Sequence, residues 1–332
     1  MIEIVAHSET MREAVRLAER VAVTDANVLI TGESGVGKDA VAFYIHSKSS
    51  RAAESFVKID CGTLPSGLLE AELFGYERGA FTGATEEKPG RLEASHRGTL
   101  VLDEIAHLSI DSQAKLLRVI ETREFERLGG RKTIKVDARL IALTNVDLGE
   151  AVKRHHFRED LYYRLHVVHI KVPALRERRE DLAELATAFV KSYAAKHGRQ
   201  VSDVSPEALA LLSEYEFPGN VRELANTVER AVIVSAGKLI ELEDLPEPIR
   251  VAVSLQRRRA VPQSLAAVEA EYVAEILAAA KGNKTEAARI LGISRKNLYE
   301  KLARQKGKDE GWKRSSSSEF NLQVAMFGQS TS

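Results

Sequence analysis

The sequence predicts an α/β fold, in which a parallel sheet covered by helices is followed by a helical subdomain and a small all-α domain. Short apolar runs alternate with helical patterns over the first half of the chain, as parallel strands alternate with their crossover helices. Strand signals then stop near Arg176, and helical periodicity alone continues to about Ile249. The third observation is a pair of short helical patterns that ends near Gln305.

A helix is predicted before the first strand, because apolar residues recur there at spacings of three and four. These residues are Met11, Ala14, Val15, Ala18 and Val21. Thr10 and Glu13 match the pattern of a capping box at its start. Five apolar runs are the predicted strands of the parallel sheet, at residues 28–30, 56–59, 99–102, 139–143 and 167–170.

We expect five parts along the chain. Residues 1–175 form the α/β subdomain. Residues 176–250 form a helical subdomain, with helices near 182–193, 206–215 and 221–234. Residues 251–264, which include three consecutive arginines and Pro262, are a linker. Residues 265–305 form the small helical domain, and residues 306–332 are a disordered tail.

The composition excludes several classes of protein. A length of 332 residues suggests two or three domains. Lys and Arg together number 48, as do Asp and Glu, so any basic surface for nucleic acid must be local. Cys61 is the sole cysteine, which rules out an internal disulfide. The chain has no signal pattern at its start and no apolar run near the roughly 18 residues of a membrane span, so we expect a cytoplasmic protein without a membrane partner.

A phosphate-binding loop is predicted directly after the first strand, where it opens a helix. Its residues are Gly32, Glu33, Ser34, Gly35, Val36, Gly37 and Lys38. Backbone N–H groups of this loop would hold phosphate, with Lys38 on the β- and γ-phosphates. The generic motif continues with a Ser or Thr for magnesium, whereas this chain has Asp39. Residues 32–39 are therefore the candidate nucleotide-binding residues.

Two adjacent carboxylates, Asp103 and Glu104, end the third predicted strand. Alternation along a strand sends neighbouring side chains in different directions, so one can hold Mg²⁺ while the other faces an attacking water. We predict that Asp103 is the metal-binding residue and that Glu104 is the general base. Asn145 ends the fourth predicted strand, where it would sense the γ-phosphate or be an ordinary strand cap.

Three arginines are candidates for the same site. Arg158 and Arg164 lie six residues apart, and a hydrolytic site gains from an arginine delivered to the developing charge, often by a neighbouring subunit. Surface salt bridges would explain the two equally well. Arg222 opens a helix of the helical subdomain, where it would report the nucleotide state or be a solvated helix charge.

A short loop with glycines near both ends carries an aromatic residue at its tip. The loop consists of Gly79, Ala80, Phe81, Thr82, Gly83 and Ala84. Two glycines let its backbone visit positive φ, and an apolar ring in a polar loop suggests a partner that receives it. The alternative is a turn whose Phe81 packs into the core. We favour a docking loop, because Phe74 already supplies an apolar anchor nearby.

The predicted helices near the C-terminal end resemble a helix-turn-helix. Asn283 and Ser294 are expected to cap the two helices. The second helix should direct five polar residues outward, namely Arg295, Lys296, Asn297, Lys301 and Arg304. Residues 281–314 contain eleven Lys or Arg against four Asp or Glu, so double-stranded DNA is the favoured partner. A helical hairpin for protein contact is the alternative.

Together these motifs resemble the AAA+ domain of bacterial enhancer-binding proteins, which activate the sigma-54 form of RNA polymerase. The resemblance covers about residues 2–249 and rests on residues 32–39, 72–75, 79–84, 102–105, 157–165, 175–178 and 218–224. Residues 282–302 resemble the Fis-type helix-turn-helix found at this place in the same family. Nothing before the first helix is long enough to be a sensory domain, so we expect no N-terminal regulatory domain.

The resemblance implies a five-stranded AAA+ P-loop sheet with a helical lid, in a ring that is usually hexameric. Such a ring hydrolyses ATP between subunits and uses Phe81 and Thr82 to engage sigma-54 and remodel the closed promoter complex. Arg158 and Arg164 match the arginines that act in trans, Asn145 matches the first sensor and Arg222 the second. An acidic residue at the position of Asp39 is common in the family.

One departure concerns the catalytic base. Asp60 stands where the family usually has Asn, which is thought to hold the catalytic Glu until sigma-54 engages. If Asp60 approaches Glu104 as that Asn would, two carboxylates lie together. Two other functions stay open at this point: a AAA+ remodelling ATPase for another protein target, and a DNA-binding regulator no longer coupled to sigma-54.

Overall fold

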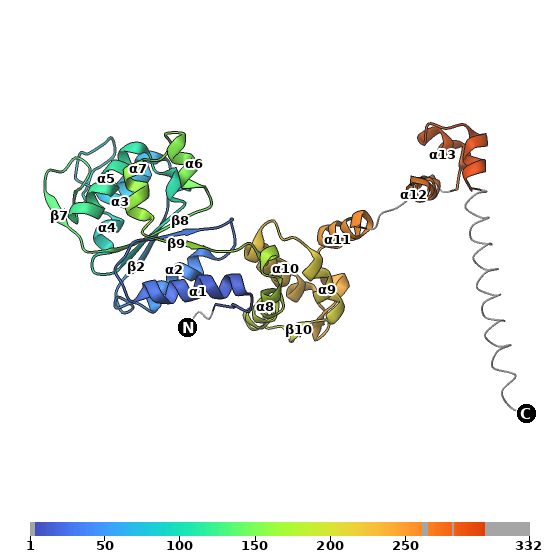
Figure 1. The fold of residues 1–332 in the computed structure, drawn as a ribbon, viewed down its shortest axis with the longest axis horizontal. Helices are drawn as coiled ribbons and strands as arrows, with labels where there is room; N and C mark the ends of the chain where they lie inside the picture. The colour runs from blue at the N-terminus through green and yellow to red at the C-terminus, as the bar shows by residue number, and fades with distance from the viewer. Residues whose placement is uncertain (1–3, 261–264, 281, 303–332) are drawn as a thin grey trace, which may run out of the picture. The chain divides into compact units, whose positions relative to one another are not determined.

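The computed structural model describes residues 4–260, 265–280 and 282–302 (Figure 1). These residues belong to two compact units, residues 1–253 and residues 254–332. The first unit contains the sheet and the helical lid, and the second contains the C-terminal helices. Each unit is described by itself.

The central sheet has five parallel strands in the order β2-β5-β8-β1-β9, which confirms the predicted parallel sheet. Residues far apart in sequence therefore become neighbours at its carboxyl edge, where Thr31 pairs with Thr144 and Asp60 with Asp103. The bounds are Val28–Thr31 for β1, Phe56–Asp60 for β2, Thr99–Asp103 for β5, Arg139–Thr144 for β8 and Val168–Lys171 for β9.

Helices cover the sheet on both faces, and the strands divide their side chains between two cores (Figure 1). In β1, Val28 and Ile30 pack into the core beneath α1 and α2, whereas Leu29 packs into the core beneath α3, α5 and α7. This division follows from the two-residue period of a strand. These helices span Glu9–Ala22 (α1), Lys38–Ser47 (α2), Ser66–Phe74 (α3), Ile110–Thr122 (α5) and Glu159–Leu165 (α7).

Short elements complete the α/β part. Two small antiparallel ladders join β3 to β4 and β6 to β7. The bounds are Gly75–Tyr76 (β3), Lys88–Pro89 (β4), Glu124–Glu126 (β6), Thr133–Lys135 (β7), Arg91–Ala94 (α4) and Leu148–Lys153 (α6), with a 3-10 turn at Ile105–His107. Three further 3-10 turns, Leu175–Glu177, Arg179–Asp181 and Leu242–Asp244, lie at the entry to the lid or within it.

The start of α1 differs from the sequence prediction. Ser8, and not Thr10, is the N-cap, and its hydroxyl accepts from the backbone N–H of Met11. The carboxylate of Asp181, fully buried, accepts from the backbone N–H of His7 at 2.7 Å, the backbone N–H of Ser8 at 2.8 Å and the Ser8 hydroxyl at 3.1 Å. The cap is thus held by tertiary bonds that a local motif does not reveal.

The lid consists of helices with one apolar core of their own. They span Leu182–His197 (α8), Pro206–Glu214 (α9), Asn220–Val234 (α10) and Glu247–Ala260 (α11). The three predicted helices are confirmed, but the lid also contains a parallel ladder of two residues per strand, Asp203–Val204 (β10) with Leu239–Ile240 (β11). Strands this short leave too little periodicity for sequence patterns to detect.

The predicted linker at residues 251–264 is helical over most of its length. Helix α11 continues to Ala260, and residues 261–264 lie outside the described residues. No Gly or Pro interrupts residues 249–261, and Arg and Leu are good helix formers, so the helix need not stop before Pro262. Val253 packs into the lid core, which ties this part of α11 to the lid.

The second unit contains α12 (Leu265–Ala279), α13 (Lys284–Ile290) and a helical segment at residues 295–302. Both predicted caps are confirmed: Asn283 accepts from Thr285 and Glu286, and Ser294 accepts from Asn297. Ala287, Ala288 and Leu298 are buried together with Val273 of α12. Across the described ranges, none of the helices is both long and apolar enough to cross a membrane. The predicted tail lies outside these ranges.

Replacing Asp181 should loosen the attachment of α1. Asp181→Ala leaves the buried N–H of Ser8 and the partly buried N–H of His7 without an acceptor and Arg178, 3.9 Å away, without its counter-charge, so we expect a loss of about 2–3 kcal/mol in the free energy of unfolding. Chemical denaturation followed by circular dichroism measures this loss. Glu180→Ala, at an exposed neighbour, is the control, and an equal loss in both variants would contradict the assigned role.

Candidate functional site

The loop between β1 and α2 has the backbone of a phosphate-binding loop. Gly35 and Gly37 adopt φ values of 79° and 103°, which side chains rarely allow. A Cβ on Gly35 would also lie 2.3 Å from the carbonyl oxygen of Gly219 in the lid. Glycine at position 35 is therefore required both by its own backbone and by the approach of the lid.

Lys38 begins α2 and is nearly buried, with 7% of its surface exposed. Its ammonium donates to the carbonyl oxygens of Gly32 at 2.8 Å and Glu33 at 3.2 Å, and lies 3.9 Å from Oε1 of Glu104. Burial lowers the pKa of Lys38, and the carboxylates of Glu104, Asp103 and Asp39 oppose that fall. The lysine is thus held against its own loop, facing acidic groups.

The two acidic residues at the end of β5 have different partners, although β5 ends at Asp103 and strand alternation therefore does not extend to Glu104. Asp103 forms an ion pair with Lys58 of β2 at 2.8 Å. Glu104 lies in the left-handed region at φ 52°, and its Oε2 accepts from the backbone N–H of Asn145 at 3.2 Å. The strained backbone turns Glu104 toward Lys38 and the end of β8.

A cavity of about 240 Å³ joins these groups. Its walls come from the phosphate loop, from Asp103 and Glu104, and from Phe189 of α8 and Arg222 of α10. Of the predicted nucleotide residues, Ser34, Gly35, Gly37, Lys38 and Asp39 line it. Asn145 does not, but it lies on a second cavity of about 330 Å³ that Gly32 and Glu33 also border.

The lid is bonded to the phosphate loop by a cluster that we call the lid latch: Glu33, Arg176, Asn220 and Arg222. Glu33 accepts from Arg176 at 2.8 and 2.5 Å and from the amide of Asn220 at 3.0 Å. Arg222 donates to the hydroxyl of Ser34 at 3.0 Å through its side chain and to the carbonyl of Gly35 at 3.2 Å through its backbone. The Arg176 guanidinium and the Asn220 amide lower the pKa of Glu33 to about 2.

Sequence reasoning missed the part that Asn220 plays in this latch. Asn220 is fully buried, adopts φ 53°, and its side-chain oxygen accepts from the backbone N–H of Leu175 at 2.8 Å. It therefore links the phosphate loop, the entry to the lid and α10. The Gly-Asn pair at the start of a predicted helix was the available signal, since Asn tolerates a left-handed backbone better than most residues do.

Arg158 and Arg164 do not reach the cavity of their own chain. Arg158 is bonded to Asp160 at 3.0 and 2.7 Å, and Arg164 to Glu121 at 3.2 Å. Both arginines are more than one-third exposed, at 37% and 60%. Within one chain, both arginines therefore form surface ion pairs.

Phe81 lies outside the core, so the alternative of a buried turn is wrong. Its surface is 41% exposed, and its ring packs edge-on against Tyr76 at 5.0 Å between centroids. Gly79 and Gly83 have φ values of 83° and 103°, and the backbone N–H of Gly79 donates to Ala84 at 2.8 Å. The loop is closed at its base and presents an aromatic ring to solvent.

The neighbourhood of Asp60 differs from the expectation. Oδ1 of Asp60 accepts from the backbone N–H of Gly62 at 2.8 Å, whereas Glu104 is bonded to Asn145 and lies near Lys38. No hydrogen bond links Asp60 to Glu104 in this described region. Cys61, next in sequence, is buried, and this burial with the charges of Asp60, Asp103 and Glu104 raises the pKa of its thiol to about 12.

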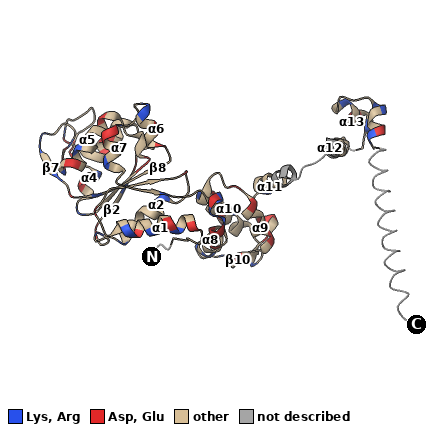
Figure 2. Cartoon of the chain, viewed as in Figure 1, with Lys and Arg blue, Asp and Glu red and all other residues tan. Residues whose placement is uncertain are grey.

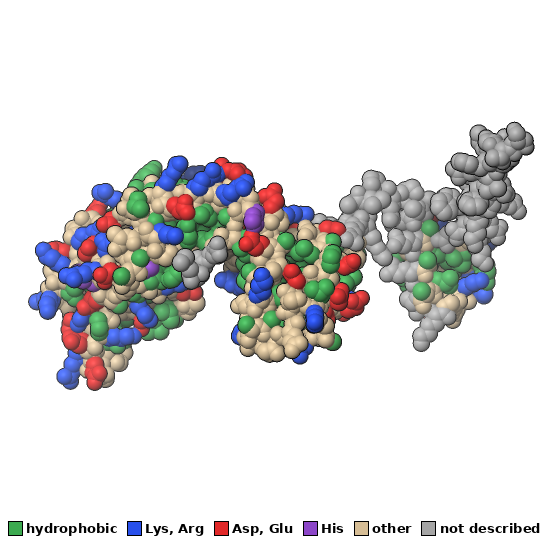
Figure 3. Space-filling view, turned by 90° about the horizontal axis from the view of Figure 1, so that it is seen from below, with side chains coloured by type: hydrophobic (Ala, Val, Ile, Leu, Met, Phe, Trp, Pro, Cys, Tyr) green, Lys and Arg blue, Asp and Glu red, His purple; other side chains and the backbone are tan. Residues whose placement is uncertain are grey.

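The helical segment at residues 295–302 presents Arg295, Lys296 and Asn297 to solvent, as predicted. Lys301 is a correction: it is only 24% exposed and forms an ion pair with Glu269 of α12. Its long stem can reach back to that carboxylate, which sequence spacing does not reveal. Arg304 lies outside the described residues. In the first unit, Lys and Arg are interspersed with Asp and Glu along the helices and over the face that Figure 3 shows (Figures 2 and 3).

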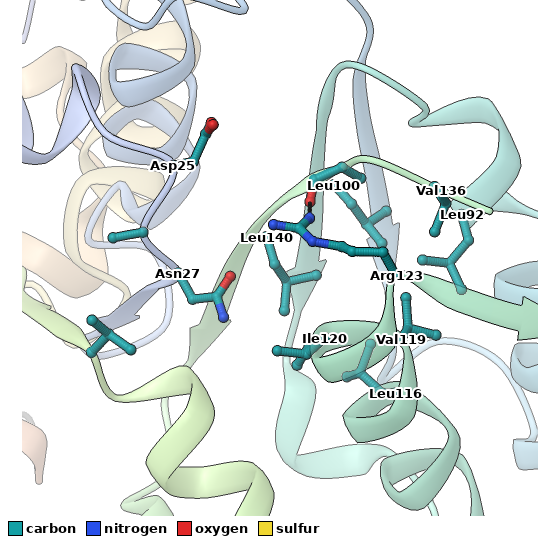
Figure 4. A pocket seen from close by; sticks show the side chains of 13 residues that line it. Asp25, Asn27, Leu92, Leu100, Leu116, Val119, Ile120, Arg123, Val136 and Leu140 are labelled. Carbon is teal, nitrogen blue, oxygen red and sulfur yellow. Dashed lines mark hydrogen bonds between the residues drawn. The ribbon is translucent and has the colours of Figure 1, made fainter.

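A cavity of about 220 Å³, lined mostly by apolar residues, lies away from these groups (Figure 4). Leu116, Val119 and Ile120 of α5 form one wall. The guanidinium of Arg123, which also lines the cavity, donates to the carbonyl oxygen of Ala138 at 2.6 Å. The cavity also meets residues 25–27, before β1, and therefore lies at the amino edge of the sheet. Ligands of parallel sheets bind at the opposite edge, so this cavity is not the candidate site.

Comparison with protein families gives three adjoining matches. Residues 4–171 match the Sigma-54 interaction domain, and residues 176–261 match an AAA+ ATPase lid domain. Residues 264–304 match the Fis family of bacterial regulatory proteins. The three matches follow the same order as the sheet, the lid and the C-terminal helices.

Similar proteins include several bacterial regulators. The regulatory protein AtoC of Escherichia coli is 45% identical over 307 residues, which cover 90% of this chain and 67% of AtoC. The transcriptional regulatory protein FlbD of Caulobacter vibrioides is 44% identical, covering 90% of this chain and 69% of FlbD. The crystal structure of NtrX from Brucella abortus in complex with ATP has a TM-score of 0.69 and 38% identity, covering 91% of this chain and 69% of NtrX.

The lowered pKa of Glu33 makes the lid latch sensitive to acid. Its ordinary pKa of 4.5 falls to about 2, so the stabilisation that its charge supplies is complete above about pH 4.5 and is lost as the pH falls toward 2. We expect the difference in Tm between the parent chain and Glu33→Gln to stay constant from about pH 7 to 5 and to shrink below that. Glu13→Gln, on an exposed face of α1, is the control. A difference independent of pH would contradict the charge-based latch.

Proposed function

The chain belongs to the family of sigma-54-dependent transcriptional activators, and from this premise we propose a role for each of its site residues. Its function is ATP-driven activation of transcription by a AAA+ ATPase that carries a Fis-type helix-turn-helix. The two other functions left open by the sequence are not favoured. The observation that carries the proposal is the exposed Phe81 loop in the same subdomain as a phosphate loop that shares a cavity with Asp103 and Glu104.

We propose that residues 32–38 hold the triphosphate, with Lys38 on the β- and γ-phosphates. To reach them, the ammonium of Lys38 exchanges its bonds to the loop carbonyls of Gly32 and Glu33 for phosphate oxygens. Arg222 is already bonded to Ser34, so it would carry a change in the phosphate loop to α10 and the lid. Asn145 would act as a sensor through β8, whose end also bonds Glu104.

We propose Mg²⁺ as the metal ion that accompanies ATP. Asp103 and Asp39 fit it, because one carboxylate oxygen of each residue lies within 2.8 Å of the same point, which the Lys58 ammonium now occupies. Among the described residues, no group of three acidic, His or Cys side chains could hold a metal by itself. The fit is that of a metal shared with phosphates, which is how Mg²⁺ usually binds, and such an ion neutralises charge on the transferred phosphoryl group.

Glu104 would accept the proton of the attacking water. Its carboxylate is 20% exposed and lies near Lys38 and the backbone of Asn145, so it would lie close to a γ-phosphate held by Lys38. Arg158 and Arg164 would stabilise the developing charge in a neighbouring copy, because their exposed position keeps them out of their own cavity. This division requires a ring, and we propose a hexamer.

The loop of residues 79–84 would contact sigma-54. The base of this loop is tied to a second loop, residues 128–130, since the backbone N–H of Glu77 donates to the carbonyl of Leu128 at 3.0 Å and a Cβ on Gly129 would lie 2.8 Å from Cβ of Ala80. The two loops would therefore move together. Arg295, Lys296 and Asn297 are the proposed contacts to DNA upstream of the promoter. Because DNA and RNA polymerase lie in the bacterial cytoplasm, we propose that compartment.

Two substitutions should separate nucleotide binding from hydrolysis. Lys38→Ala removes the cation from the phosphates and should abolish binding of a fluorescent ATP analogue. Glu104→Gln keeps the shape of the base but not its basicity, so it should bind within about threefold of the parent and lose at least about 100-fold in kcat. Normal turnover in Glu104→Gln would remove it as general base.

Replacing the exposed ring should uncouple hydrolysis from transcription. Phe81→Ala removes a side chain that touches no nucleotide-binding residue, so we expect ATPase activity within about twofold of the parent and no formation of open promoter complexes. Capture of sigma-54 in the presence of a transition-state nucleotide analogue should be lost in parallel. Val23→Ala, at an exposed apolar residue after α1, is the control. Equal loss of both activities in Phe81→Ala would argue against a docking loop.

A further inference from the structure

A lysine from the neighbouring strand bridges the two carboxylates proposed for the metal ion. Lys58 lies on β2, opposite Val101 of β5. Its ammonium lies 2.8 Å from Oδ2 of Asp103 and 2.5 Å from Oδ1 of Asp39. Asp103 ends β5 and Asp39 lies in the first turn of α2. One cation therefore joins three elements at the carboxyl edge of the sheet.

The bridge is partly shielded from solvent. The side chain of Asp103 is 15% exposed, that of Lys58 36% and that of Asp39 53%. The contact to Asp103 is consequently stronger than an exposed surface ion pair, whereas the contact to Asp39 can break at little cost. Lys58 thus has one firm and one loose partner.

The charges around the bridge explain why a cation is needed there. Lys38 and Lys58 face the three carboxylates of Asp39, Asp103 and Glu104. Asp60 lies beside Asp103 in the strand register and adds a fourth acidic group. Without Lys58, Asp39 and Asp103 would approach a common point with no positive charge between them, and they would repel each other.

We propose that Lys58 is a resident counter-ion of the metal-binding carboxylates, which holds Asp39 and Asp103 together and withdraws when Mg²⁺ binds with nucleotide. The proposal rests on the metal-binding role given above to these two carboxylates. Lys58 is a positioning residue, since it acts on the metal ion only through Asp39 and Asp103. It competes with Mg²⁺ for their oxygens and sets how much Mg²⁺ the site requires.

The competition follows from the geometry. Mg²⁺ binds carboxylate oxygens at roughly 2.1 Å, so it cannot share Asp39 and Asp103 with an ammonium at hydrogen-bond distance without strong repulsion. Lysine has a flexible four-carbon stem, and about one-third of the Lys58 side chain already meets solvent. The ammonium can therefore move to water while the metal ion takes over both oxygens.

The test is a Mg²⁺ titration of nucleotide binding in the full chain. A fluorescent ADP analogue is held at fixed concentration, and its binding is followed as Mg²⁺ is added. Lys58→Met keeps the stem and removes the charge, so half-saturation should need about tenfold less Mg²⁺ than in the parent. Lys58→Arg keeps the charge and should stay within about twofold of the parent. Lys135→Met, at an exposed lysine paired with Glu124, is the matched control and should also stay within about twofold.

A thermal melt supplies a second readout that does not depend on a fluorescent probe. In the presence of a chelator, Lys58→Met should melt below the parent, because Asp39 and Asp103 then repel each other, and millimolar Mg²⁺ added with ADP should restore most of the difference. An unchanged or higher Mg²⁺ requirement in Lys58→Met would overturn the proposal. So would a lower Tm that Mg²⁺ with ADP does not restore, which would indicate an ordinary structural ion pair.

The same titration separates failure of this inference from failure of the proposed function. If nucleotide binding by the parent chain does not depend on Mg²⁺, the metal-binding role of Asp39 and Asp103 is wrong, and the counter-ion role falls with it. If the parent depends on Mg²⁺ but Lys58→Met and Lys58→Arg behave alike, only the role of Lys58 is overturned.

Discussion

The parallel pairing of the central strands is the constraint on which the rest of the structure depends. Its register brings the ends of β1, β2, β5 and β8 to one edge, so Thr31 meets Thr144 and Asp60 meets Asp103. The first turn of α2 begins at the same edge. Lysines and carboxylates that lie far apart in sequence thereby come within a few ångströms, in a place where the phosphate loop offers its backbone N–H groups.

The lid supplies further contacts at this edge, because its residues bond to the phosphate loop. Glu33 and Ser34 bond to residues that enter or begin the lid, and Gly35 approaches Gly219 so closely that no side chain fits between them. The phosphate loop is therefore shared by two subdomains and belongs to neither alone. A ligand that moves this loop has to move the lid with it, which is the physical basis for coupling nucleotide state to the shape of the chain.

Local sequence patterns predicted much of the fold. The five strands, α1 and the three lid helices could be predicted because apolar runs and periodic spacing report burial directly. The phosphate loop and the acidic pair could also be predicted, because each is a short contiguous motif. The lid latch could not be predicted, because Glu33 and Asn220 are 187 residues apart. The Lys58 bridge could not be predicted either, because it joins residues from three elements. Lys58 within the apolar run 56–59 was the local sign of that bridge.

The buried thiol of Cys61 has a practical consequence for following this protein at work. Reagents that label cysteine attack the thiolate, and a thiol with a pKa near 12 that is sealed beneath the surface supplies almost none at neutral pH. The folded chain therefore behaves toward maleimide dyes as if it had no cysteine. A single cysteine introduced at Thr82 would carry the only dye, and its fluorescence would follow the tip of the exposed loop through the ATPase cycle without any change to the native sequence elsewhere.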